Sequence, residues 1–544
     1  MPKIRTMIFQ SKVNLSRGIS LFLALSAVAI NANVSVTTLF SNSMVLQRNT
    51  TVPVWGKGSS GEVVTVQFNG QTKTATTNSS GKWQVILDPM PEGGPYTMTI
   101  KGNNSISITD VYMGEVWQCG GQSNMDTRVG YYPHYSSIQN SYNNPMLRYY
   151  TMRQSSANKD GYTTTNVWAT CTNSANISRL SCLGFFFGKE IQAKLGNKVA
   201  VGLIVSAVGG TKIASWLDPQ TVAAHPEIAS QDASSSAPVP GSMYNSWIAP
   251  IAGCAMRGTV WMQGENDRTS GQQVYYEDRF KLLINGWRKQ WGIGDFPFYY
   301  VQLANGYGAV QTTAGENATD MVIREAQRLA LALPNTGMAV TIDVLKTGDS
   351  LHFSNKQLVG QRLALIPRAR DYGEKNLVHA GPMYESMSIN GNKISIKFRD
   401  IGGGLITNDN KAPVSFAIAG EDKKWFWATT AMIQGDQINL TCKDVLSPKY
   451  VRYAYASNPV TNLYNKEGLP ACPFTTEGNQ LPPITSINPK TVSFGGGSCK
   501  HNSTITYSVN ILGQVVNMTH ISGSQILYQK QSNTSRRLIK LKKQ

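Results

Sequence analysis

Residues 114–125 of this 544-residue chain read Gly114-Glu115-Val116-Trp117-Gln118-Cys119-Gly120-Gly121-Gln122-Ser123-Asn124-Met125. An apolar, strand-like run leads into Gly-Gly-Gln-Ser, which predicts a tight turn with Ser123 at the carboxyl end of a buried strand. Open parallel sheets build their sites at that edge, and glycines let the backbone come close to a ligand. Ser123 is therefore a candidate nucleophile. A Gly-x-Ser turn alone is more often only a turn, so the hypothesis needs a base.

The pattern around this stretch is that of an α/β domain. Between residues 111 and 366, apolar strand-like runs alternate with amphipathic helical stretches; the runs are 111–119, 199–205, 259–262, 298–303 and 338–342. Phe280, Leu283, Ile284 and Trp287 have the i, i+3, i+4, i+7 spacing of one buried helix face. The alternation predicts a parallel sheet covered by helices on both sides.

The flanking regions have a different pattern. Residues 33–110 show short alternating runs separated by Gly, Asn, Ser and Pro, which is typical of a small β-sandwich. Residues 367–477 predict a second β-rich region associated with the core, and residues 478–499, rich in Pro, Ser, Asn and Gly, predict a linker. Residues 500–544 have strand-like pieces, and we expect them to form a separate C-terminal appendage.

The first 32 residues predict a secretory signal peptide. Four basic residues and no acidic residue precede or flank an apolar run at 19–30, and small residues follow. The alternative, a buried helix of the fold, is disfavoured by this charge pattern. No later stretch has the pattern of a transmembrane segment. We expect a protein that is secreted, at the cell surface or extracellular, with the periplasm as the alternative location.

The formal net charge of +18 first suggests a polyanionic partner such as nucleic acid. Four of the basic residues lie before residue 33 and seven lie after residue 499, with no acidic residue in either segment. Residues 33–499 therefore carry a net charge of only +7, a modest excess for so long a segment. The basicity belongs mainly to the two ends, and we expect no nucleic-acid partner.

The seven cysteines are an odd number, and none forms a C-x-x-C pair or has zinc-ligand spacing with a histidine. We therefore expect no structural zinc. One or two disulfides would be compatible with export, and Cys171 and Cys182 are the pair nearest in sequence, although the pairing does not follow from sequence alone.

A base for Ser123 must come from six histidines: His134, His225, His352, His379, His501 and His520. His352 is the best candidate because Asp349 precedes it by three residues on one predicted loop, so the carboxylate can orient the imidazole. Ser354 as N-cap and Gln357 three residues on predict a capping box for the following helix. The alternative is that Asp349 and His352 form an ordinary cluster at a helix start.

An acyl-transfer site also needs donors for an oxyanion. Two turns that follow apolar strands carry suitable groups: Val208-Gly209-Gly210-Thr211 and Gln263-Gly264-Glu265-Asn266-Asp267. The backbone N–H groups of Ser123 and Gly210, with the side-chain amide of Asn266 or Gln263, could converge on one oxygen.

These blocks resemble those of SGNH hydrolases, and the longer phrases resemble the sialate O-acetylesterase branch. The matching segments, which extend over nearly everything from Leu39 to Thr476, include 44–48, 53–56, 114–125, 202–204, 209–211, 244–250, 261–265, 324–327, 349–365 and 464–471. The resemblance implies a flavodoxin-like three-layer parallel-sheet core. It also implies Ser123 as nucleophile, His352 as general base and then acid, and Asp349 as its orienting carboxylate.

The resemblance leaves two points of the site open. Many members carry Gly-Glu-Ser in the third block, whereas this chain has Gly264-Glu265-Asn266, so the amide donor is Asn266 or, as second choice, Gln263. We predict substrate contacts for Gln122, Asn124, Glu265 and Trp216, whereas Trp117 and Trp261 lie in strand-like runs that are equally typical of core packing.

The resulting hypothesis is a secreted serine esterase that removes O-acetyl groups from carbohydrates and needs no metal or cofactor. The resemblance implies O-acetylated sialic acid as substrate, and acetylated plant glycan such as acetyl-xylan is an equal candidate. The alternative is a non-catalytic glycan-binding protein on the same scaffold. The C-terminal tail resembles the sorting domains that type IX secretion machinery recognises, so this machinery is a candidate second partner besides the carbohydrate substrate. The alternative is that the tail is a small carbohydrate-binding β module.

Overall fold

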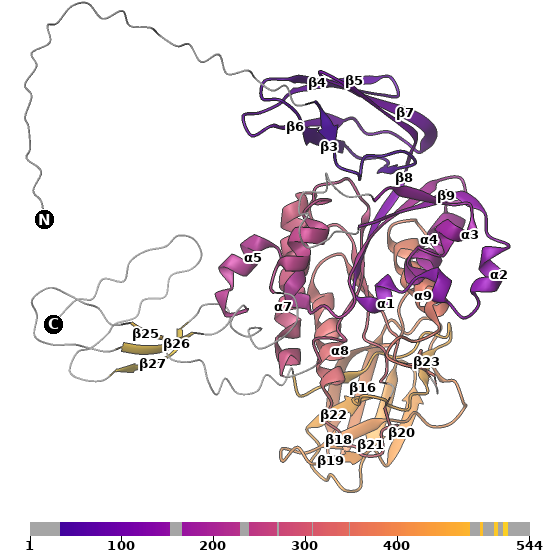
Figure 1. The fold of residues 1–544 in the computed structure, drawn as a ribbon. Coiled ribbons are helices and arrows are strands. Elements are labelled where there is room, and N and C mark those ends of the chain that lie inside the picture. The colour runs from indigo at the N-terminus through magenta and orange to yellow at the C-terminus, as the bar shows by residue number, and fades with distance from the viewer. Residues whose placement is uncertain are drawn as a thin grey trace, which may run out of the picture.

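The computed structural model describes residues 33–152, 166–228, 239–268, 271–306, 308–346 and 349–478, together with the backbone of three short strands beyond them (Figure 1). The predicted signal peptide, residues 1–32, lies outside the described residues. Nearly all of the predicted linker and most of the sorting-like tail also lie outside them, so these interpretations stay predictions.

The N-terminal region is built of short strands in two layers. One sheet has the order β1-β3-β6, and in the other β4 pairs with β5 and β7. In β6, Trp83, Val85 and Leu87 are buried and their neighbours are exposed, as expected for a strand with one face on a core. The strands are β1 (Ser35–Val36), β2 (Val45–Gln47), β3 (Val52–Lys57), β4 (Val63–Phe68), β5 (Gln71–Thr76), β6 (Lys82–Leu87) and β7 (Gly93–Lys101).

Strand β8 (Ser105–Gly121) joins this region to the core without a break. Its first part pairs with β7, and its second part lies between β11 and β12. Asp110 has a φ of 59°, where the ladder to β7 is irregular, and Arg148 donates to the Asp110 carbonyl at 2.7 Å. The predicted boundary at residue 110 therefore falls on a local kink inside one continuous strand.

The central part of the 11-stranded sheet has six parallel strands in the order β9-β11-β8-β12-β13-β14, with β10 antiparallel at one edge. Strand β2 pairs parallel with β8, and β7, β4 and β5 continue the same sheet from the first part of β8. The inner parallel strands are buried on both faces, which explains their uninterrupted apolar runs. The additional strands are β9 (Asn144–Thr151), β10 (Trp168–Cys171), β11 (Ala200–Ala207), β12 (Gly258–Met262), β13 (Phe298–Val301) and β14 (Thr336–Ala339).

Helices cover both faces of this sheet (Figure 1). The pair α4 (Cys182–Lys194) and α9 (Lys356–Arg370) packs on one face, and α7 (Tyr276–Trp291) and α8 (Thr319–Leu329) pack on the other. Phe280, Leu283, Ile284 and Trp287 are all fully buried, so the predicted helix face is confirmed. The shorter helical segments are α1 (Ser123–Asp126), Val129–Tyr131, α2 (Tyr135–Gln139), α3 (Ser174–Ile177), Ile213–Trp216, α5 (Pro219–Ala224), Tyr244–Ile248, Gln272–Tyr275 and Ala330–Ala332.

The C-terminal β region contains two four-stranded sheets, β15-β16-β21-β20 and β19-β18-β22-β24, and the pair β17-β23. Arg324 of α8 donates to the carbonyls of Ala456 and Ser457 and so ties this region to the core. Its strands are β15 (Met383–Asn390), β16 (Lys393–Arg399), β17 (Leu405–Thr407), β18 (Phe416–Ala419), β19 (Trp425–Trp427), β20 (Thr430–Gln434), β21 (Gln437–Thr441), β22 (Tyr450–Tyr453), β23 (Leu463–Asn465) and β24 (Phe474–Thr475).

Beyond residue 478, three strands form a small antiparallel sheet: β25 (Lys490–Val492), β26 (Ile505–Val509) and β27 (Val515–His520). The predicted mixed α/β architecture with additional β-rich regions is thus confirmed. No helix among the described residues combines the length and the apolar character that crossing a bilayer requires.

The cysteines of the described part of the chain are buried free thiols, Cys171 and Cys182 among them. The disulfide considered for that pair is therefore not formed. Burial raises the pKa of both thiols to about 12, which keeps them protonated and unreactive at neutral pH.

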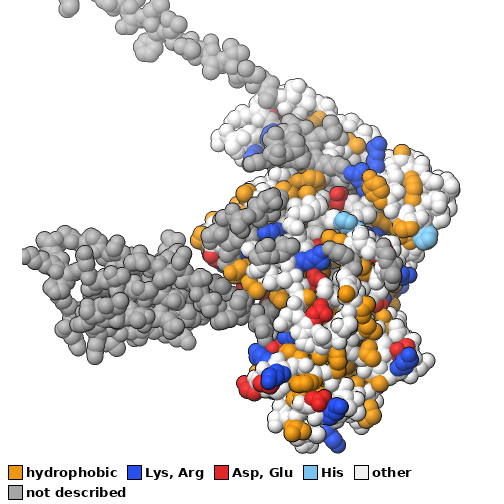
Figure 2. Space-filling model, turned by 60° about the horizontal axis from the view of Figure 1, so that its bottom comes forward, with side chains coloured by type: hydrophobic (Ala, Val, Ile, Leu, Met, Phe, Trp, Pro, Cys, Tyr) orange, Lys and Arg blue, Asp and Glu red, His pale blue; other side chains and the backbone are white. Residues whose placement is uncertain are grey.

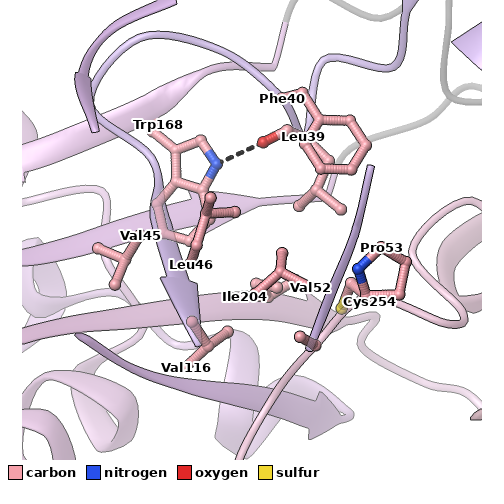
Figure 3. A pocket seen from close by; sticks show the side chains of 11 residues that line it. Leu39, Phe40, Val45, Leu46, Val52, Pro53, Val116, Trp168, Ile204 and Cys254 are labelled. Carbon is pink, nitrogen blue, oxygen red and sulfur yellow. Dashed lines mark hydrogen bonds between the residues drawn. The ribbon is translucent and has the colours of Figure 1, made fainter. Parts of the chain in front are cut away.

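A small apolar cavity of about 20 Å³ lies between the N-terminal strands and the central sheet (Figure 3). It is lined by side chains such as Leu46, Val116 and Ile204, and Trp168 beside it donates to the Leu39 carbonyl at 2.8 Å. The space is about that of one water molecule and its lining is apolar, so it is a packing gap and not a ligand site.

Candidate active site

Ser123 lies where the sequence predicts it, immediately after the carboxyl end of a central strand. Gly121 ends β8 with a φ of 139°, and a Cβ there would lie 2.0 Å from the Met262 carbonyl oxygen. The chain can therefore make this turn only with glycine. Ser123 opens the short helix α1 and is partly exposed, so its hydroxyl is at the surface of the sheet edge.

The second turn passes directly beside Ser123. It follows β11, the parallel neighbour of β8, and the Val208 N–H donates to the Gly121 carbonyl at 3.1 Å. A Cβ on Gly209 would lie 3.3 Å from the Cβ of Ser123, so the backbone here approaches the serine closely. Gly210 has a left-handed φ of 73°.

The third turn is tied to the second. The Asn266 amide donates to the Gly210 carbonyl at 2.7 Å, and the Asn266 side chain is partly exposed. Ser123, Gly210 and Asn266, which are far apart in sequence, thus lie around one edge of the sheet. This arrangement can present backbone and side-chain donors beside a serine hydroxyl.

Gln263, the second choice for oxyanion donor, is hydrogen-bonded to other groups of the protein. Its amide nitrogen donates to the Thr211 carbonyl at 3.0 Å and to the Asp267 carboxylate at 2.5 Å, and its oxygen accepts from Tyr276. The side chain is only 1% exposed. The prediction that Gln263 could serve as donor is wrong for this structure, because both of its amide hydrogens already have protein acceptors.

Three predicted substrate contacts are also corrected. Gln122, Asn124 and Glu265 are 2%, 1% and 4% exposed, respectively. Gln122 accepts from Gln263, and Asn124 donates to Glu265 at 2.5 Å. All three side chains are buried and hydrogen-bonded to other protein side chains, so they cannot meet a sugar in this arrangement.

Trp216 is likewise not available for stacking on a sugar ring. It is fully buried, donates to the Thr211 hydroxyl at 3.0 Å and packs edge-on against Trp261, with ring centroids 5.6 Å apart. The prediction of a substrate contact is wrong here. The uninterrupted Ile213-Ala214-Ser215-Trp216-Leu217 run, all of it buried, was the signal for a core position.

Asp349 and His352 lie on the loop before α9. The His352 side chain is exposed, its backbone N–H donates to the Ser350 hydroxyl, and the Asp349 carboxylate accepts from the Lys346 N–H. Within the described residues, the hydrogen bonds of a triad are not formed among Ser123, His352 and Asp349. Catalytic hydrogen bonds often form or shorten only when substrate binds.

The start of α9 differs from the prediction. Asn355, not Ser354, is the N-cap, and its side chain accepts from the Leu358 N–H at 3.2 Å. Gln357 accepts instead from the Tyr132 hydroxyl, so the predicted capping box is not formed. The loop nevertheless meets the nucleophile turn, because Asn124 donates to the Leu351 carbonyl at 3.3 Å.

Lys356 is a site residue that the sequence analysis missed. It is the first residue of α9, is 2% exposed, and donates to the side-chain oxygen of Asn124. Burial lowers the pKa of its ammonium to about 7, although the charges of Glu265 and Asp349 oppose that shift. A cation in the first turn of a helix meets the positive end of the helix dipole, and this unfavourable position was the available signal.

No group of three or more His, Cys, Asp and Glu side chains in the described residues is arranged to hold a metal ion. On the described part of the face in Figure 2, Lys and Arg side chains lie among Asp and Glu side chains and do not form one continuous basic patch.

Comparison with known proteins gives one consistent result. The family model described as carbohydrate esterase, sialic acid-specific acetylesterase, matches residues 113–366. The human sialate O-acetylesterase is 30% identical over 390 residues, covering 64% of this chain and 73% of the human protein. The rat sialate O-acetylesterase is 27% identical over 535 residues, covering 84% of this chain and 97% of the rat protein.

A solved structure supports the same relationship. A carbohydrate acetylesterase from Xanthomonas citri is 32% identical, with a TM-score of 0.74, and the match covers 82% of this chain and 99% of that one. These matches show that the chain is a carboxylic ester hydrolase. It belongs to the sialate O-acetylesterase family of carbohydrate esterases.

Proposed function

We propose that this chain is a serine esterase with an SGNH-type core that removes O-acetyl groups from sialic acids. The observation that carries the proposal is the position of Ser123 at the carboxyl end of β8, beside the Gly209-Gly210 turn and the Asn266 amide bonded to it. The relatives named sialate O-acetylesterase, one of which is covered over 97% of its length, favour sialic acid as the sugar.

In the proposed mechanism, His352 takes the proton of the Ser123 hydroxyl as its oxygen attacks the acetyl carbonyl carbon. The carbonyl oxygen becomes an oxyanion that accepts from the backbone N–H groups of Ser123 and Gly210 and from the Asn266 amide. The ester C–O bond breaks, and the sugar oxygen leaves with the proton from His352. Water, deprotonated by His352, then attacks the carbonyl carbon of acetyl-Ser123; the bond between that carbon and the Ser123 oxygen breaks, this oxygen takes the proton back from His352, and acetate leaves. Asp349 orients the imidazole.

Acetate release from O-acetylated sialic acid and from acetyl-xylan, measured side by side, tests this function. We expect acetate from the sialic acid ester, and loss of nearly all turnover in Ser123→Ala and in His352→Ala. Ser136→Ala and His134→Ala are matched controls on exposed positions of the α2 region and should retain wild-type rates.

Three outcomes would contradict the proposal. Release from acetyl-xylan alone would overturn the substrate assignment. Substantial turnover by Ser123→Ala would overturn the mechanism. Binding of the glycan by the wild type without release of acetate would favour a non-catalytic glycan-binding protein.

We further propose that the enzyme is exported, through a signal peptide at residues 1–32 and a sorting-like tail at residues 500–544. The support is the charge and apolar pattern of the two ends. Mass spectrometry of the protein from the culture medium should find both segments removed. Recovery of the full chain inside the cell would contradict export.

A further inference from the structure

A buried ammonium lies beneath the nucleophile turn, and the acyl-transfer steps do not use it. Lys356 is 2% exposed, and its nitrogen lies 3.6 Å from the ring centre of Phe353. Lysine is almost never buried this deeply unless its charge has partners, because desolvating an ammonium costs free energy. The contacts of the ammonium must therefore offset this cost.

Those contacts converge on one side chain, Asn124. The Lys356 ammonium donates to the Asn124 oxygen, and the Asn124 nitrogen donates to the Glu265 carboxylate at 2.5 Å. An ammonium can only donate and a carboxylate only accept, so these two neighbours fix which end of the amide faces which way. The same nitrogen then faces the Leu351 carbonyl at 3.3 Å.

The oriented amide connects the two catalytic segments. Asn124 directly follows Ser123, and Leu351 directly precedes His352. Glu265 directly precedes Asn266 in the third turn. One buried amide, held between a cation and an anion, thus contacts the loop of the proposed base and the turn of the proposed oxyanion donor. A shift of this amide would move the serine and the histidine relative to each other.

We propose that Lys356 is a positioning residue that, through Asn124, holds the His352 loop in register with the Ser123 turn. The inference rests on the proposed function, since it takes Ser123 and His352 as the reacting pair. Lys356 itself does not touch substrate. Its role is to keep the attacking oxygen and the imidazole in a productive arrangement, to which acyl transfer is steeply sensitive.

The test compares Lys356→Met, which keeps the length of the side chain and removes the donor, with Lys289→Met at an exposed position of α7. Acetate release should show a fall in kcat of about 10-fold to 100-fold for Lys356→Met, with KM within about 3-fold of wild type. Lys289→Met should match the wild type. A kcat for folded Lys356→Met within 2-fold of wild type would overturn the proposal.

A double-mutant cycle separates positioning through Asn124 from a general structural role. Asn124→Asp can still accept from Lys356, but it cannot donate to Glu265 or Leu351. We expect Asn124→Asp to lower kcat as much as Lys356→Met, and the double variant to lose no more than either alone. Losses that multiply in the double variant would overturn the proposal. If Lys356→Met does not fold, the kcat of Asn124→Asp tests the proposal instead. A wild-type kcat for Asn124→Asp would then overturn the proposal.

The failure of this inference differs from the failure of the proposed function. If Lys356→Met is fully active while Ser123→Ala is inactive, the function holds and the positioning role is wrong. If the wild type releases no acetate from any ester, or if Ser123→Ala stays active, the function itself is wrong.

Discussion

At the scale of single residues, Gly121 couples the end of the central strand to the turn that carries Ser123. Its φ of 139° and the 2.0 Å approach that a Cβ would make to the Met262 carbonyl leave no room for a side chain. The neighbouring backbone must shift to admit one, and Ser123 is two residues away.

We therefore predict that Gly121→Ala lowers turnover more than 10-fold and destabilises the protein by at least about 1–3 kcal/mol. Gly196→Ala is the matched control, because Gly196 also has a positive φ, 67°, but a Cβ there meets nothing within 4 Å. Thermal unfolding and acetate release measure both effects. Equal behaviour of the two variants would contradict the steric explanation.

A second prediction concerns Lys356 and the pH dependence of stability. Burial lowers the pKa of its ammonium to about 7 from an ordinary value of 10.5. Between these values the folded state binds fewer protons than the unfolded state, so this lysine makes the free energy of unfolding rise with pH. The charged or titratable groups that act on it are Glu265, Asp349 and Cys182.

Lys356→Met should remove this dependence, which amounts to at most about 1.4 kcal/mol per pH unit. Relative to wild type, the variant should be most stable near pH 6, and this advantage should be smaller at pH 9 and disappear only above the ordinary lysine pKa of 10.5. Denaturant unfolding at both pH values provides the measurement. A stability difference between variant and wild type that does not change with pH would show that the lysine does not titrate in this range.

The position of Ser123 after a buried strand was predictable from sequence because a glycine-rich turn after an apolar strand is a local pattern. The predicted substrate contacts of Gln122, Asn124 and Glu265 require exposed side chains, whereas all three are buried. Their burial depends on partners far away in the chain: Asn124 lies 141 residues from Glu265 and 232 residues from Lys356. No local pattern reveals such pairs.

At the scale of elements, α9 begins at the loop that carries His352. Asn355 caps it by accepting from the Leu358 N–H. We predict that Asn355→Ala costs about 1 kcal/mol of stability, as loss of an N-cap does. Ser354→Ala should stay within about 0.5 kcal/mol, as for a surface substitution that removes no cap. Chemical denaturation of both variants measures the difference, and a larger cost at Ser354 would move the cap back to the position that the sequence suggested.

Five of the six parallel strands were predictable from uninterrupted apolar runs, and α7 was predictable because its apolar residues recur at helical spacing. The junction at residue 110 was not. The sequence changes pattern there because the neighbours of the strand change, from β7 to β11 and β12, while the strand itself continues. The change in the strands beside β8 was interpreted as a domain boundary.

At the scale of the whole molecule, one buried carboxylate connects the N-terminal region to the core. Glu115 in β8 is paired with Arg48 at 2.6 Å and with Arg257 at 2.9 Å, and its side chain is fully buried. Burial alone would raise the pKa of this carboxyl, but the two guanidinium groups outweigh it and lower the pKa.

Removing this anion should take the carboxylate partner from Arg257 and leave Arg48 with only the exposed Glu92. We predict that Glu115→Ala lowers the free energy of unfolding by about 3–5 kcal/mol at pH 7. Glu92→Ala, which removes an exposed partner of Arg48, should cost at most about 1 kcal/mol. Because the folded pKa of Glu115 is lowered, its contribution should be present above the ordinary carboxyl pKa of 4.5 and be lost as pH falls through the folded value. Unfolding curves at pH 7 and pH 4 measure the free energy of unfolding of both variants. Equal losses for Glu115→Ala and Glu92→Ala at both pH values would contradict this prediction.

The central claim is that Ser123 carries the acetyl group during turnover, and covalent labelling tests it most directly. A fluorophosphonate ester, which forms a stable adduct with an activated serine, is incubated with the full-length enzyme while acetate release from O-acetylated sialic acid is followed, and the label is then located by peptide mass spectrometry. We predict that one label per chain appears on Ser123 and that activity falls in proportion to it. Complete loss of activity with the label on another residue, or full activity with Ser123 labelled, would contradict the claim.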